Sequence, residues 1–154
     1  MHTPLYAVSD DPSSPTPVTL DRIRGVIEHL GASMETAENG KAGLAVFDGV
    51  RFLFSFASNH KFLSVRAIWA TDLEASAERL MSFFTAADSW NREKYFPTVY
   101  NLLVDDMIQV VADYICDIDC GQTDAQLLDN VAAGVATGVD AIQYMHQAAQ
   151  SIIR

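Results

Sequence analysis

The sequence has few cysteines, few basic residues and no long apolar run, and each shortage excludes a class of protein. Two cysteines in 154 residues cannot form the disulfide framework of a small secreted domain. Ten basic residues against twenty acidic ones give a net charge of −10, which argues against binding to nucleic acid or to an anionic membrane surface. No apolar stretch approaches the roughly 20 residues that a membrane-spanning helix needs.

The start of the chain lacks the features of an export signal. No basic region precedes the apolar stretch at residues 5–8, which is too short for the core of a signal peptide. We therefore expect a cytoplasmic protein in which Cys116 and Cys120 are free thiols. Residues 1–17 contain four of the five prolines and offer little to bury. They are predicted to form a disordered leader before a single domain at residues 18–154.

The rest of the sequence alternates between helix and strand signals. A first helix is expected between a cap at Thr19 and a terminating Gly31. Alternating apolar residues after the Asp48–Gly49 turn predict a hairpin. Further elements are expected as strands at residues 50–57, 61–70, 98–104 and 107–117, a weak strand at residues 33–37, and helices at residues 71–88 and 124–150. Tight hairpins imply antiparallel neighbours. The predicted fold class is therefore α+β, a twisted antiparallel sheet of about five strands flanked by three helices.

The second of these helices is predicted to begin at a capping box formed by Thr71 and Glu74. Its apolar residues, including Leu80, Met81 and Phe84, are expected to be buried. A polar and aromatic connector at residues 89–97 follows.

Three motifs, taken in order, resemble the YbjN-type domain family. They are the hairpin sequence at residues 47–52, the Ser-Trp-Asn sequence at residues 89–91 followed by Phe96, Pro97 and Tyr100, and the end of the sheet at residues 110–127. The resemblance covers roughly residues 19–145. It implies a fold similar to that of type III secretion chaperones, which pair into dimers, together with the label of a sensory transduction regulator. It implies no catalytic residues.

Two adjacent residues in the connector are candidates for partner binding. Trp90 is expected either to plug the core, which is the more common role of a buried indole, or to line a groove for a partner segment. In the first case Asn91 would cap the preceding helix or the connector's own amides.

Aspartates dominate the last third of the chain, where residues 95–154 carry eight acids and one base. Asp113, Asp117 and Asp119 are predicted to form an acidic edge whose partner is basic. The two cysteines cannot complete a four-ligand zinc shell, and the four histidines are scattered. We therefore expect no metal and no cofactor.

The last helix carries an apolar seam at alternating spacings of three and four residues. Its candidate dimer positions are Leu128, Val131, Val135, Ile142 and Met145. The seam could pack only on its own sheet. It could instead belong to a long helix shared with a second copy, or the helix could break at Gly134 or Gly138.

These observations favour a non-enzymatic protein-binding or regulatory module, acting as a homodimer with a chaperone-like or sensory role. The sequence has neither a phosphate-binding glycine loop nor a nucleophile elbow. The alternative is a small-ligand or divalent-metal sensor, or a hydrolase, that uses the aspartate-rich end of the sheet.

Overall fold

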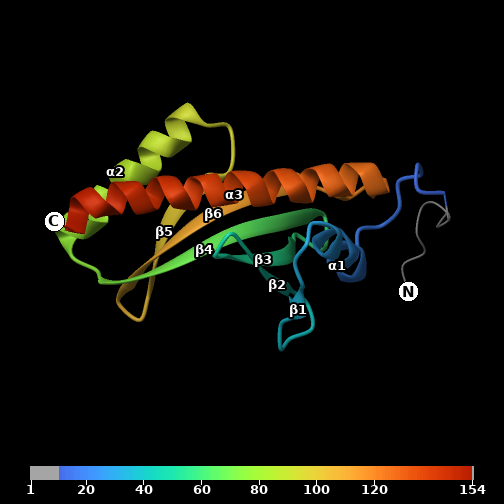
Figure 1. Ribbon diagram of the computed structural model, residues 1–154, viewed down its shortest axis with the longest axis horizontal. Coiled ribbons are helices and arrows are strands. Elements are labelled where there is room, and N and C mark those ends of the chain that lie inside the picture. The colour runs from blue at the N-terminus through green and yellow to red at the C-terminus, as the bar shows by residue number, and fades with distance from the viewer. Residues whose placement is uncertain (1–10, 154) are drawn as a thin grey trace.

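The computed structural model describes residues 11–153 of the chain, as three helices and a sheet (Figure 1). In chain order the elements are α1 (Leu20–His29), β1 (Glu35–Thr36), β2 (Gly43–Phe47), β3 (Val50–Ala57), β4 (Phe62–Glu74), α2 (Ala77–Glu93), β5 (Thr98–Val104), β6 (Met107–Asp117) and α3 (Asp124–Ile153). The six strands form one sheet in the order β1-β2-β3-β4-β6-β5, and every neighbouring pair is antiparallel. The predicted α+β class is confirmed, with a sixth strand of only two residues where the sequence signal is weak.

The first helix follows its local signals closely. The Thr19 hydroxyl accepts a hydrogen bond from the Arg22 amide at 3.2 Å, which satisfies one of the free amides at the helix start. Ile23 and Ile27 are fully buried, as their shared helix face predicts. Gly31 takes a φ of +93°, the left-handed conformation that ends many helices.

The hairpins also follow from local chemistry. Asp48 and Gly49 both have positive φ, as a two-residue turn between antiparallel strands requires. Asp105 and Asp106 adopt the same backbone region between β5 and β6. Aspartate tolerates it better than most residues, so these two acids are explained by the turn.

The predicted start of the second helix is wrong. Thr71 and Glu74 belong to β4, and Glu74 pairs with Met107 of β6. The Thr71 hydroxyl donates to the Ile108 carbonyl at 2.6 Å, so a partner strand distant in sequence overrides the local capping pattern. The helix begins instead at Ala77, where the Ser76 hydroxyl accepts from the Arg79 amide. It extends into the expected connector and ends at Glu93.

The last helix is continuous and lies along one face of the sheet (Figure 1). Its N-terminus carries the expected capping box, in which Thr123 and Gln126 exchange side-chain and backbone hydrogen bonds. Gly134 and Gly138 do not break the helix. They lie against the sheet, and a Cβ atom added to Gly138 would fall 2.8 Å from Cε1 of Phe52.

The described part of the expected leader, residues 11–17, contacts the domain. Thr16 exchanges backbone hydrogen bonds with Gln122, and the Arg22 guanidinium donates to the carbonyls of Thr16 and Pro17. These contacts tie the segment to the start of α3. Residues 1–10 of that leader lie outside the described residues.

Candidate functional site

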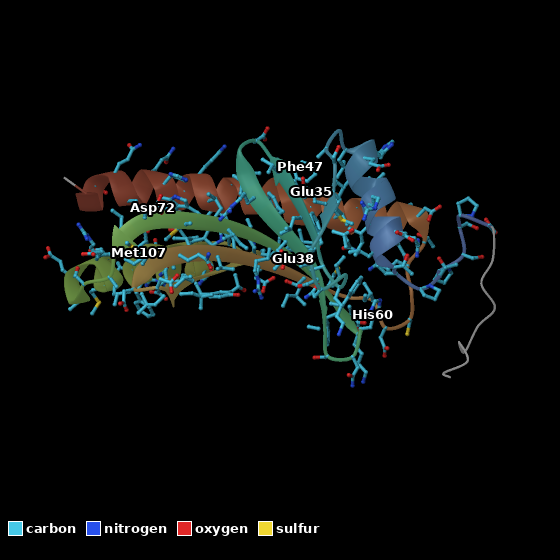
Figure 2. All side chains as sticks on the ribbon, turned by 90° about the horizontal axis from the view of Figure 1, so that it is seen from below. Glu35, Glu38, Phe47, His60, Asp72 and Met107 are labelled. Atoms are coloured by element: carbon cyan, nitrogen blue, oxygen red, sulfur yellow. The ribbon has the colours of Figure 1, made fainter. Side chains whose placement is uncertain are left out.

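One face of the sheet carries no helix. Figure 2 looks at the molecule from below and shows β4 and β6 in front, with α3 behind them. Side chains alternate between the two faces of a strand. Phe52, Val65 and Ala112 therefore point toward the helices and are almost completely buried, while their neighbours point to this uncovered side. We call the uncovered side the open face.

The strand register places one row of open-face side chains across the whole sheet. In order from β1 to β5, it contains Glu35, Leu44, Leu53, Arg66, Asp113 and Thr98. The row has apolar side chains on β2 and β3 and an ion pair on β4 and β6. Asp113, one of the predicted site residues, thus lies on the open face, on the strand next to the edge strand β5.

Asp113 is held by a dense network on this face. Its Oδ1 accepts from the Ser64 hydroxyl at 2.6 Å, and its Oδ2 lies 3.0 Å from Nη2 of Arg66. The Asp113 side chain is only 9% exposed, against 32% for Arg66. Burial raises the pKa of the nearby Tyr100 phenol, and Asp113 adds to this while Arg66 opposes it. Asp113 is therefore neutralised within the sheet and offers little free charge to a partner.

Substituting Asp113 with alanine is expected to destabilise the fold by about 1–3 kcal/mol, because Ser64 and Arg66 lose their shared acceptor. Urea unfolding measures this difference. Asp119→Ala is the matched control: its carboxylate is exposed, so the free energy of unfolding should change by less than about 0.5 kcal/mol. Equal effects of the two substitutions would contradict the role given to the Asp113 network.

The two other aspartates of the predicted acidic edge lie at the end of β6. Both are exposed, and Oδ1 of Asp117 accepts a hydrogen bond from the Asp119 amide at 2.9 Å. This contact closes a local turn of the kind that aspartate favours. Over residues 11–153, no group of three or more His, Cys, Asp or Glu residues could hold a metal ion.

Trp90 and Asn91 lie at the end of α2 and serve the fold. Trp90 is 6% exposed, and its indole N–H donates to the Pro97 carbonyl at 3.0 Å. The Asn91 side chain donates to the Val99 carbonyl and accepts from the Val99 amide, both at 2.8 Å. Trp90 thus occupies the core, which is the first of its two interpretations, and Asn91 caps a strand rather than a helix.

The apolar seam of the last helix packs on the chain's own sheet. Exposure is at most 8% at four of the five candidate positions, namely Val131, Val135, Ile142 and Met145. Leu128 is partly buried. This face of α3 is therefore part of the hydrophobic core and has little surface left for a second copy.

A groove that the sequence did not reveal lies between α2 and β5. It has a volume of about 580 Å³ and is lined by apolar residues of the helix and by the edge strand. Met81 and Phe84, predicted to be buried, are 65% and 64% exposed. Phe83, Ala87 and Trp90 are buried instead. The expected helix ends at residue 88 and leaves Trp90 in the connector, so it misses the buried face formed by Phe83, Ala87 and Trp90 at spacings of four and three.

The outer edge of β5 has backbone groups free for pairing. The backbone N–H and C=O of Val99 point away from β6, since both form hydrogen bonds with the Asn91 side chain. In an antiparallel strand, every second residue directs its N–H and C=O to the same side. Asn101 and Leu103 therefore present theirs at the sheet edge, beyond the Asn91 cap. Oδ1 of Asn101 is also buried without a hydrogen-bond partner among the described residues.

The two cysteines are free and differ in environment, Cys120 being exposed and Cys116 partly buried. Burial, with a smaller contribution from Asp117, raises the pKa of Cys116 to about 11. At pH 8 roughly one Cys116 thiol in a thousand is then ionised, and only the thiolate reacts.

A chromogenic disulfide reagent should titrate one thiol rapidly and the second only after unfolding. A Cys120→Ser variant that keeps the fast phase would contradict this assignment.

Comparison with known proteins identifies the fold. The family model of YbjN, described as "Putative bacterial sensory transduction regulator", matches residues 19–147. A solved structure described as "Crystal structure of YbjN, a putative transcription regulator from E. coli" is similar with a TM-score of 0.66 and 18% identity. The match covers 90% of this chain and 96% of that chain. A search of curated proteins gives no match. Within residues 11–153, no helix is long and apolar enough to cross a membrane.

Proposed function

The chain belongs to the YbjN family, and from this premise we propose that it is a non-enzymatic regulatory module that binds other protein chains and acts as a homodimer. The observation that carries the proposal is the apolar groove between α2 and the free edge of β5. An uncovered strand edge beside exposed apolar side chains is a site at which another chain can add a strand.

The spacing of the free backbone groups fits pairing between two copies of β5. With a twofold axis at Leu102, Asn101 of each copy lies opposite Leu103 of the other. Both residues direct their backbone groups outward, so each such pair can exchange two hydrogen bonds. Asn91 already occupies Val99 and would end the ladder.

The composition of the surface also favours a second copy. Six of the exposed large apolar side chains lie on α2, β5 or the start of β6: Met81, Phe84, Leu102, Leu103, Val104 and Met107. Asp88 is the one charged residue lining the groove, and it pairs with Arg92 at 3.3 Å. Two chains with a charge of −10 each repel one another, so they can meet only where acidic residues are few.

Light scattering on the purified chain tests the homodimer. We expect a mass of twice 16.9 kDa at micromolar concentration. Salt should not weaken the association, because the contact is apolar and salt screens the repulsion between the two acidic chains. A mass of 16.9 kDa at every concentration up to the millimolar range would overturn this part of the proposal.

A further protein partner is proposed to be basic. Asp117 and Asp119 are exposed and form no ion pair within residues 11–153. They lie at the end of β6 farther from the α2–β5 groove, so the partner and the second copy would not compete. This attraction depends on exposed charges and is screened by salt, unlike the apolar contact between copies.

A further inference from the structure

A second depression lies on the open face, at the opposite edge of the sheet from β5. It has a volume of about 580 Å³ and is bounded by the loop at residues 31–33, by β1 and β2, and by side chains of β3, β4 and β6. This size falls within the usual range for small-molecule sites. None of the residues proposed for the dimer contact lines it.

The floor of this depression is mainly apolar. Leu44 and Val46 of β2 are 41% and 57% exposed, and Ile68 of β4 continues the same surface. Val46 lies directly opposite Arg51, and Arg51 directly opposite Ile68, in the strand register. A single row across three strands therefore places a cation between two apolar side chains.

Arg51 differs from the other arginines of residues 11–153 because no acid or carbonyl engages its guanidinium. The five others are each held: Arg22 by Asp124, Arg24 by the Met34 carbonyl and Thr36, Arg66 by Asp113, Arg79 by the Glu74 carbonyl, and Arg92 by Asp88. The chain has twice as many acids as bases, yet the Arg51 guanidinium lies beside an apolar surface without an acidic partner in the described residues. Its positive charge is therefore available to bind an anion.

We propose that this depression binds an amphipathic monocarboxylate, an apolar chain ending in one carboxylate. The planar guanidinium of Arg51 can hold a carboxylate through two parallel hydrogen bonds. The apolar chain would cover Leu44, Val46 and Ile68 and remove their surface from water. Glu35 lines the same depression and forms no ion pair with Arg51 within the described part of the chain. Its negative charge disfavours a head group with more than one negative charge.

The site is independent of the proposed dimer and would allow a small molecule to regulate the module.

The test of this site uses decanoate below the concentration at which it forms micelles, with calorimetry for affinity and amide NMR shifts for location. We expect saturable binding and shifts at residues 31–33 and 44–46. Arg51→Gln should weaken decanoate binding about tenfold or more. Lys61→Gln removes the same charge from an exposed turn and should leave binding unchanged.

Two further arms distinguish a specific site from an apolar surface. Decanol lacks the charge, so its weaker binding should not respond to Arg51→Gln. Val46→Glu introduces a carboxylate opposite Arg51 and should abolish decanoate binding while the fold is retained. The proposal is overturned if wild-type protein does not bind decanoate at millimolar concentration, if Arg51→Gln binds it equally well, or if only an acidic peptide produces the NMR shifts.

Discussion

Substituting Leu103 with arginine is expected to convert the proposed homodimer into a 16.9 kDa monomer. Leu103 is 54% exposed in the single chain, so the fold does not depend on its burial. In the proposed pairing Leu103 lies opposite Asn101 of the second copy. Because the contact is twofold symmetric, the substitution places two positive charges, one from each copy, in the apolar surface between them. Because central apolar contacts dominate interface energies, the dissociation constant should rise at least about a hundredfold. Light scattering over a dilution series measures it.

Ile115→Arg is the matched control for this substitution. Ile115 is 56% exposed and also lies on a strand of the same sheet, but it points from β6 to the open face. The same change in charge and size there should leave the association intact. If both variants dissociate, the presence of an added arginine rather than its place on the β5 edge decides the result. If neither does, the copies associate through another surface.

Substituting Gly138 with valine should destabilise the fold by at least about 2 kcal/mol, since overpacked cores lose roughly 1–3 kcal/mol or more. A Cβ atom at this position would lie 2.8 Å from Cε1 of Phe52 and 3.2 Å from Cβ of Ala67. Both residues are buried in the sheet beneath α3, so neither can move into solvent. Urea unfolding monitored by circular dichroism measures the loss.

Gly25→Val separates this packing effect from helix propensity. Gly25 is an exposed residue of α1, and a Cβ atom added there has no neighbour within 4 Å. The same substitution should therefore change stability by less than about 0.5 kcal/mol. Comparable losses at both glycines would show that α3 does not pack on the sheet as closely as described.

Much of the fold could be predicted because its signals are local. The Thr19 cap, the Gly31 terminus and the Asp48–Gly49 turn each depend on a few consecutive residues, and each is confirmed. The boundary at residue 71 could not be predicted in this way. The Thr71 pattern satisfies the rules of a capping box, but the hydroxyl finds a better partner in β6, which follows more than thirty residues later.

The candidate site shows the same division. The sequence predicts Asp113 as part of an acidic edge, whereas its neutralisation by Arg66 and Ser64 depends on the register between β4 and β6. The sequence predicts Trp90 and Asn91 as candidates for partner binding, and only the packing of α2 beside β5 shows that they serve the core and the sheet edge. Which face of α2 is exposed depends on its packing against α3 and β5, which the local pattern does not show.

From the sequence alone, the turn and cap signals and the alternating apolar residues determined the α+β fold class, and three short motifs carried the family resemblance. Composition and short-range hydrogen bonding act within a few residues, so a sequence displays them directly. Only the tertiary structure decided which apolar faces are buried, which strand edge is free and that Arg51 has no partner among residues 11–153. Each of these depends on segments distant in sequence, which strand pairing and helix packing bring together.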